Sequence, residues 1–173
     1  MPADRIEVVV ESVRVHMLSS QHVVILREVG GHRYLPIWIG PWEANAIAMR
    51  LQGVSPERPL THDLFVATLT DLGAVVREIV IVDLAEETFH ARILLDAAGA
   101  THDIDARPSD AVALALRVGA PIFAAAAVMD RAGIRSDEPL GAEEEKLSVF
   151  RDFVNSLDVD AEDERRGGRP PAQ

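Results

Sequence analysis

The sequence predicts an α+β fold with a mixed β-sheet and an internally duplicated strand–helix–loop–helix unit. Three observations indicate this fold. Short aliphatic segments bounded by turn residues are typical of strands, and longer segments that open at Pro or Thr and close at Gly are typical of helices. The two kinds of segment alternate irregularly along the chain, which favours α+β over a regular βαβ pattern. The third observation is an internal repeat.

The repeat consists of two similar stretches, Pro41 to Arg50 and Pro108 to Arg117. Proline, an acid, alanines, an aliphatic residue and arginine recur in the same order and at the same spacing in both stretches. Such self-similarity usually marks a duplicated supersecondary unit. Duplication would bring two similar helix starts, carrying Glu43 and Asp110, into one fold.

The individual elements follow from alternation and from the positions of Pro and Gly. Helices are predicted where Pro or a capping residue precedes the segment and Gly follows it, and Thr61 is the expected N-cap of the second helix. The predicted strands are 6–15, 22–29, 33–39, 75–84, 87–96, 101–106 and 121–124. The predicted helices are 41–52, 62–72, 108–118 and 126–132.

The chain is expected to contain one domain, at residues 1–140. With 173 residues, 48% of them hydrophobic, it can bury a substantial core. Residues 141–157 show helical spacing of apolar side chains with acids in the first turn, so a C-terminal helix is predicted there. Residues 158–173 are charged and then rich in Gly and Pro, which predicts a disordered tail.

Charge and composition restrict the function classes. The formal net charge is −11, so the chain as a whole does not attract nucleic acid, and any such binding needs local arginines or bridging metal ions. The absence of Cys excludes disulfides, thiolate metal sites and a Cys nucleophile. No signal-peptide pattern and no membrane-length apolar run is present. We therefore expect a cytoplasmic protein without a membrane partner.

Three charged residues near the repeated helix starts are candidates for chemistry. Glu43 and Asp110 lie in first turns, where exposed N–H groups and the helix dipole stabilise an acid. That explains both residues without a function, although facing helix starts could also hold a metal ion or a substrate. Arg107 precedes Pro108 at a cap position that normally prefers Ser, Thr, Asp or Asn. It either forms a structural ion pair or binds a phosphate.

A second cluster contains Arg58, His62 and Asp63. A helix start favours a neutral imidazole, so His62 could act as a general base or metal ligand, although a lone His is also commonly structural or simply exposed. Arg58 could bind a phosphate or pair with Asp63. The Walker A, G-x-G-x-x-G, H-E-x-x-H and G-x-S-x-G motifs are absent.

At these residues the chain resembles the bifunctional nuclease domain family over residues 6–134. The matching segments are Leu35 to Gly40, Glu43-Ala44, Arg58-Pro59, Thr61 to Leu64, Leu72-Gly73, Thr88-Phe89 and Asp105 to Ala111. The resemblance implies an α+β fold and activity on both DNA and RNA. This sequence departs from the family pattern at His90, where Tyr is common, and at Ala125 to Ala127, where acids are common.

The resemblance, together with the clustered acids and arginines, predicts a nuclease that hydrolyses phosphodiester bonds of DNA and RNA. We expect His62, Asp63 and Asp110 to be catalytic, and Arg58 and Arg107 to bind the substrate. Mg²⁺ or Mn²⁺ would be held by Glu43, Asp63 and Asp110. The alternative is a non-enzymatic interaction or anion-binding module whose polar cluster is a structural ion-pair network. The hydrophobic first hairpin is also compatible with a homodimer.

Overall fold

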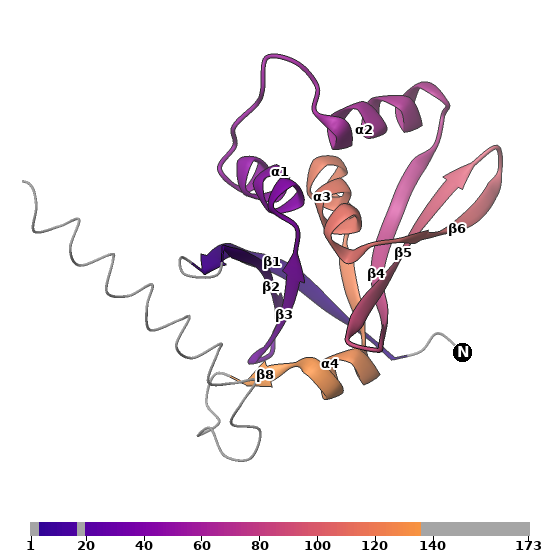
Figure 1. The fold of residues 1–173 in the computed structure, drawn as a ribbon. Coiled ribbons are helices and arrows are strands. Elements are labelled where there is room, and N and C mark those ends of the chain that lie inside the picture. The colour runs from indigo at the N-terminus through magenta and orange to yellow at the C-terminus, as the bar shows by residue number, and fades with distance from the viewer. Residues whose placement is uncertain (1–3, 17–19, 136–173) are drawn as a thin grey trace, which may run out of the picture. The chain divides into compact units, whose positions relative to one another are not determined.

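The computed structural model describes residues 4–16 and 20–135, which form an eight-stranded mixed sheet with four helices (Figure 1). The strands are β1 (Arg5–His16), β2 (Gln21–Glu28), β3 (Arg33–Ile39), β4 (Val75–Ala85), β5 (Thr88–Ala97), β6 (Ala100–Ala106), β7 (Ile122–Ala125) and β8 (Ile134–Arg135). Their order across the sheet is β6-β5-β4-β7-β1-β2-β3-β8. The predicted α+β class with a mixed sheet is therefore confirmed.

The sheet joins two antiparallel meanders. Strands β1, β2 and β3 pair in chain order on one side, and β4, β5 and β6 do so on the other. Strand β7 lies between the meanders, parallel to β4 and antiparallel to β1. Because β7 comes after all six meander strands, the centre of the sheet closes only when this late segment is inserted.

The four helices are α1 (Pro41–Leu51), α2 (Thr61–Asp71), α3 (Pro108–Val118) and α4 (Ala126–Ala132). Helices α1 and α3 pack against each other and against the sheet. Both helices bury alanines, whose small side chains allow close packing: Ala44, Ala46, Ala111, Ala113 and Ala115 are all buried. Both helices begin at a Pro, as predicted, and each is followed by a glycine with positive φ, Gly53 or Gly119.

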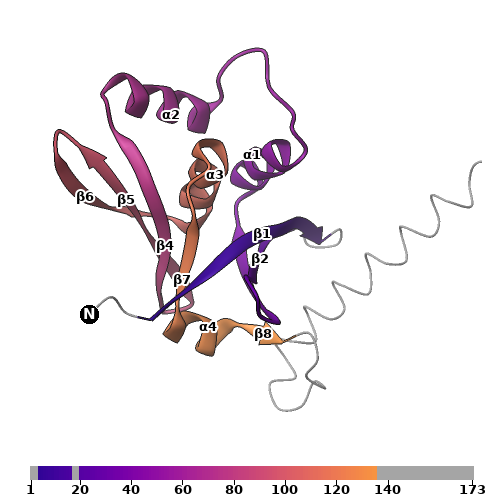
Figure 2. The same cartoon turned by 180° about the vertical axis from the view of Figure 1, so that it is seen from behind.

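Helix α2 is placed differently. It packs mainly on α3 and contributes no buried residue to the core, and Leu64 and Phe65 remain 60% and 41% exposed. Figures 1 and 2 show it above α1 and α3, while α4 lies at the other end of the strands. The start of α2 is thereby held over the α3 helix.

Two details differ from the sequence prediction. Helix α2 begins at Thr61 itself and its N-cap is Leu60, so the prediction of Thr61 as N-cap is wrong. The backbone N–H of Leu60 donates instead to Asp63 Oδ2 at 2.9 Å, which supplies the stabilising contact from inside the helix. Strand β8, which extends the sheet beyond β3, was not predicted.

Several predictions are not tested by the fold. The helix at 141–157, the tail at 158–173 and the end of the 1–140 domain lie outside the described residues. Helices α1 and α3 have the same length and the same Pro start, but their origin by duplication stays a prediction. Among the described helices, none is both long and apolar enough to cross a membrane.

Candidate active site

Three helices carry an acid at the same place, the third residue of the helix. These acids are Glu43 in α1, Asp63 in α2 and Asp110 in α3. None of the three N-cap residues caps its helix with a side-chain hydrogen bond: they are Gly40, Leu60 and Arg107. A negative charge in the first turn is favoured by the helix dipole, so each acid has a structural reason to be present.

Four of the predicted site residues form one continuous chain of contacts. Arg107 Nη2 donates to Glu43 Oε1 at 2.7 Å, and Arg107 Nε donates to Asp110 Oδ2 at 2.7 Å. The second carboxylate oxygen of Asp110, Oδ1, lies 3.0 Å from His62 Nε2. The starts of α1, α2 and α3 therefore meet at a single cluster of Glu43, Arg107, Asp110 and His62, which we call the helix-start cluster.

The side chains of the helix-start cluster differ in their exposure to solvent. The Arg107 side chain is 65% exposed and that of Asp110 is 34% exposed, whereas those of Glu43 and His62 are 15% and 14% exposed. Arg107 is thus the member that an incoming anion would meet first.

The electrostatics of the cluster keep Asp110 ionised. Burial by itself would raise the pKa of Asp110, but hydrogen bonds from Arg107 and His62 outweigh it, and the pKa lies below its ordinary value. The pKa of Arg107 is raised, mainly by its hydrogen bond to Asp110 and next by its hydrogen bond to Glu43. An Asp110 with a lowered pKa is ionised near neutral pH, so it can hold an imidazole but cannot serve as a general acid there.

The contact with Asp110 determines what His62 can offer. An ionised carboxylate accepts a hydrogen bond, so Nε2 carries the proton and the neutral ring leaves Nδ1 as an acceptor. No hydrogen-bond partner of Nδ1 is found in residues 4–16 and 20–135, and no buried side-chain nitrogen or oxygen there lacks a partner. Nδ1 therefore reaches solvent and can accept a proton from water.

Asp63 belongs to a separate group of contacts. Its Oδ2 accepts from the Leu60 backbone, and its Oδ1 accepts from Arg117 Nε at 2.6 Å. Burial opposes ionisation of Asp63, but these bonds outweigh it and lower its pKa. Arg117 also donates to the carbonyls of Ala113 and Ala46, and only 7% of its side chain is exposed. Asp63 thus fixes the start of α2, the turn that carries His62.

Sequence reasoning missed Arg117 as a site residue. The repeat aligned it with Arg50, but the alignment was interpreted only as a mark of duplication. The two arginines make related contacts, because Arg50 Nε donates to the Leu116 carbonyl across the same helix pair. Their matched positions at the ends of α1 and α3 were the feature that could have predicted this role.

Arg58 lies outside both groups of contacts. It is exposed, and the described part of the chain provides it with no ion-pair or hydrogen-bond partner. The alternative of an ion pair between Arg58 and Asp63 is wrong, since Asp63 pairs with Arg117. Arg58 is therefore a cation on the loop before α2 that is available to an anionic ligand.

The predicted metal ligands do not come together as a three-residue set. Arg107 Nη2 lies 2.7 Å from both Glu43 Oε1 and Asp110 Oδ2, and so occupies the space between these carboxylates. Across residues 4–16 and 20–135, no three His, Cys, Asp or Glu side chains are arranged to hold a metal ion. As arranged, these donors do not fit a metal ion. A cation would contact Glu43 and Asp110 only in place of Arg107.

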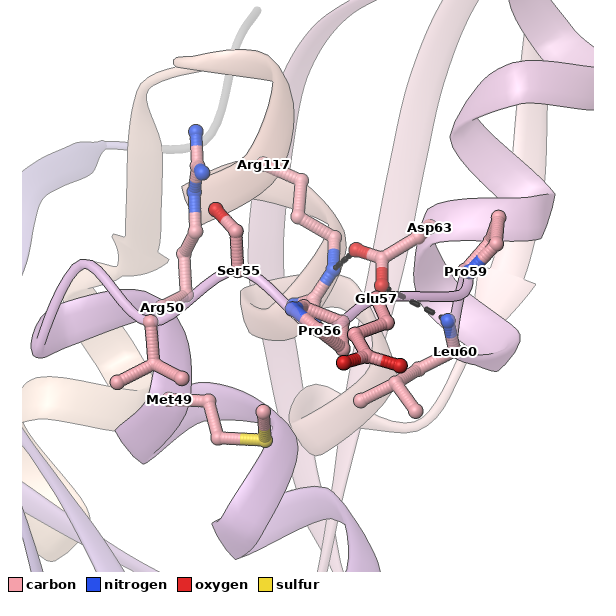
Figure 3. Close-up of a pocket in the computed structure, with 10 residues that line it drawn as sticks. Met49, Arg50, Ser55, Pro56, Glu57, Pro59, Leu60, Asp63 and Arg117 are labelled. Carbon is pink, nitrogen blue, oxygen red and sulfur yellow. Dashed lines mark hydrogen bonds and ion pairs between the residues drawn. The ribbon is translucent and has the colours of Figure 1, made fainter.

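A pocket of about 350 Å³ lies against the first turn of α2 (Figure 3). Its walls come from the end of α1, the loop before α2, the first turn of α2 and the end of α3. The lining residues are Met49, Arg50, Val54, Ser55, Pro56, Glu57, Pro59, Leu60, Asp63 and Arg117. Asp63 lines it while the adjacent His62 contacts Asp110, so the pocket and the cluster share the first turn of α2.

This sequence departs from the family pattern in two places. Ala125 ends β7, and Ala126 and Ala127 begin α4. His90 is exposed on β5, next to Ala91, which pairs with Ala106. Ala106 in turn precedes Arg107, so His90 is one residue away from the strand position that leads into α3.

Comparisons with known proteins place this chain in a family. A sequence model of the bifunctional nuclease domain matches residues 24–137. Uncharacterized proteins from two strains of Mycobacterium tuberculosis are each 46% identical to this chain over 160 residues, which cover 89% of this chain and 96% of theirs. The match includes every residue of the helix-start cluster, as well as Arg58, Asp63 and Arg117. The chain belongs to the bifunctional nuclease domain family.

Proposed function

We propose that this protein is a nuclease that hydrolyses phosphodiester bonds of DNA and RNA at the helix-start cluster. Membership of the family supports a nuclease-type activity. The observation that carries the proposal is the His62–Asp110 contact, which leaves His62 Nδ1 open to solvent as a proton acceptor. DNA lacks a 2′-hydroxyl, so activity on both polymers requires water as the nucleophile.

His62 is the proposed general base. Its Nδ1 takes a proton from the attacking water as the new oxygen–phosphorus bond forms, and the leaving oxygen is protonated by solvent. Asp110 holds Nε2–H and stabilises the imidazolium that results. A general base of this kind contributes roughly 10²- to 10⁴-fold to a rate.

Arg107 and Arg58 are the proposed phosphate-binding groups. Arg107 uses Nε and Nη2 within the cluster, its side chain is largely exposed, and Nη1 makes no hydrogen bond within the described residues. Arg58 adds a cation without an internal partner in the described residues. These two arginines supply positive charge that the net charge of −11 does not give the molecule as a whole.

Assistance by Mg²⁺ or Mn²⁺ is a separate part of the proposal. A divalent ion would polarise the phosphate, and Glu43 and Asp110 would hold it only once Arg107 had left them. Asp63 would have to leave Arg117 to take part. The steps assigned to His62, Asp110 and the arginines do not depend on this ion.

One observation favours the alternative of a non-enzymatic interaction module. The ion pairs that join Glu43, Arg107 and Asp110 are complete within the protein, as expected for a structural network between α1 and α3. We also infer that these helices derive from a duplicated unit, because Arg50 and Arg117 at matched positions each bond to a carbonyl across the helix pair. Duplication fits either function.

The two functions are separated by measuring cleavage with highly purified protein. His62→Ala is expected to reduce cleavage of single-stranded DNA and RNA by roughly 10²-fold or more, with an unchanged fold by circular dichroism. His32→Ala, which changes an exposed loop histidine, is the matched control. Equal cleavage by wild type and His62→Ala would remove His62 from the mechanism. Absence of cleavage in the wild type would favour the interaction module.

A further inference from the structure

The pocket between α1, α2 and α3 has no part in the proposed hydrolysis. It nevertheless shares the first turn of α2 with the helix-start cluster. At about 350 Å³ it lies at the small end of the range of roughly 300–1,000 Å³ typical of small-molecule sites. It therefore suits a ligand of one ring system rather than an extended chain.

The polar groups at the α2 and α3 side of the pocket are already satisfied. Arg117 Nε donates to Asp63, which also accepts from the Leu60 backbone (Figure 3). The Nη1 and Nη2 atoms of Arg117 donate to the carbonyls of Ala113 and Ala46. These groups cannot bind another ion without breaking a bond. A guanidinium whose nitrogens are engaged can still offer its flat face to a stacked base.

Apolar side chains supply much of the remaining surface. Met49, Val54, Pro56, Pro59 and Leu60 come from the end of α1 and the loop before α2. Such a lining accepts the faces of a flat aromatic ligand and disfavours a free phosphate or a sugar alone.

Unsatisfied polar groups lie around this apolar surface. Ser55 and Glu57 are exposed and make no hydrogen bond or ion pair within the described part of the chain. Arg50 uses Nε on the Leu116 carbonyl, which leaves its two terminal nitrogens as donors. The pocket thus offers a carboxylate acceptor, a hydroxyl and guanidinium donors to the edge of a ligand.

We propose that this pocket is a nucleobase subsite that selects guanine in the nucleic-acid substrate. Guanine presents the complementary groups: adjacent N–H donors for the Glu57 carboxylate, and O6 and N7 acceptors for Arg50. The inference rests on the proposed nuclease function. It adds that cleavage takes place next to a guanine, whose base enters the pocket while the neighbouring phosphate lies near His62 and Arg107.

The test is a calorimetric titration of the full chain with GMP, AMP and ribose 5-phosphate. GMP is expected to bind about ten-fold or more tightly than either of the others, since one good bidentate base contact discriminates by about that factor. Glu57→Gln is expected to remove most of the preference for GMP over AMP. Ser55→Leu, which fills the pocket from its exposed loop, is expected to abolish GMP binding.

A control variant completes the binding test. Glu86→Gln changes an exposed carboxylate in the turn between β4 and β5 and should leave GMP binding unchanged. Equal binding of GMP, AMP and ribose 5-phosphate, or a Glu57→Gln protein that binds GMP like wild type, would overturn the subsite.

Failure of the subsite and failure of the nuclease proposal give different results. His62→Ala should retain GMP binding while losing cleavage, because His62 does not line the pocket. Cleavage that depends on His62 without GMP binding overturns only the subsite. GMP binding that depends on Glu57, in a protein that cleaves nothing, supports a guanine site and removes the nuclease.

Discussion

His62 Nε2 and Asp110 Oδ1 lie 3.0 Å apart although 48 residues separate them in the sequence. One stands in the first turn of α2 and the other in the first turn of α3. The contact exists because α2 packs on α3 rather than on the sheet. It fixes one imidazole nitrogen and leaves the other to solvent.

Asp110→Asn tests whether this contact sets the tautomer of His62. An amide can donate to Nε2, which favours the ring with its proton on Nδ1 and so removes the proposed proton acceptor. The rate of cleavage is expected to fall by roughly 10²-fold or more, while substrate binding changes much less. Asp103→Asn, in the edge strand β6 near Arg92, is the control. Cleavage by Asp110→Asn at the wild-type rate would contradict the assignment.

Arg107→Gln tests whether a divalent ion competes with the guanidinium. The variant frees Glu43 and Asp110, so Mn²⁺ is expected to raise the melting temperature of Arg107→Gln more than that of wild type. An ion present at 100 times its dissociation constant adds about 2.7 kcal/mol to the free energy of unfolding. That corresponds to a rise of roughly 5–10 °C in a chain of this size.

The control for this measurement is Arg92→Gln, since Arg92 also lies between two acids, Asp103 and Asp105. Adding Glu43→Gln to Arg107→Gln should cancel the extra rise. Identical shifts in wild type, Arg107→Gln and the double variant would exclude an ion between Glu43 and Asp110.

Acid should destabilise the protein partly through Asp63. The folded state lowers the pKa of Asp63, so its contribution to stability is present above the unfolded value of about 3.9 and is lost as the pH falls through the folded value. Asp63→Asn removes this contribution. Its urea midpoint should therefore be lower than that of wild type at pH 7 but should decline less between pH 5 and acid.

At neutral pH the loss in Asp63→Asn is expected to be about 1.5–3 kcal/mol, the usual value for hydrogen bonds to a charged group. Glu86→Gln, which changes an exposed turn carboxylate, should follow the wild-type pH dependence. An Asp63→Asn protein whose midpoint falls as steeply with acid as that of wild type would show that other carboxylates dominate.

Arg58→Gln tests the role of the unpaired loop arginine. Loss of one phosphate contact is expected to weaken binding of single-stranded DNA at all sequences and to reduce the slope of log affinity against log salt by about 0.7. Arg77→Gln, on β4 beside Asp96, removes an exposed arginine elsewhere and should leave the slope unchanged. If Arg58→Gln keeps the wild-type slope, Arg58 lies outside the surface that binds DNA.

Local patterns were sufficient to predict most elements. The Pro starts of α1 and α3 and the glycines after them fix the helix ends through φ alone, and no distant contact is needed. The prediction of Thr61 as the N-cap of α2 was wrong, although Thr is a favoured N-cap residue when only the local sequence is considered. In the fold, Asp63 supplies the contact to the Leu60 backbone from inside the helix, so the helix begins one residue earlier than predicted.

The sequence by itself determined the strands β1 to β7, the helices α1 to α4 and the presence of an acid in the first turn of α1, α2 and α3, because these depend on neighbouring residues. It also indicated which charged residues near the helix starts are candidates for chemistry. Only the tertiary structure decided which of these residues contact one another. Packing of α2 on α3 joins His62 to Asp110, whereas Asp63, one residue later and on another side of the helix, turns to Arg117. Adjacent helical residues point about 100° apart, so their partners are chosen by the surrounding packing and not by local sequence.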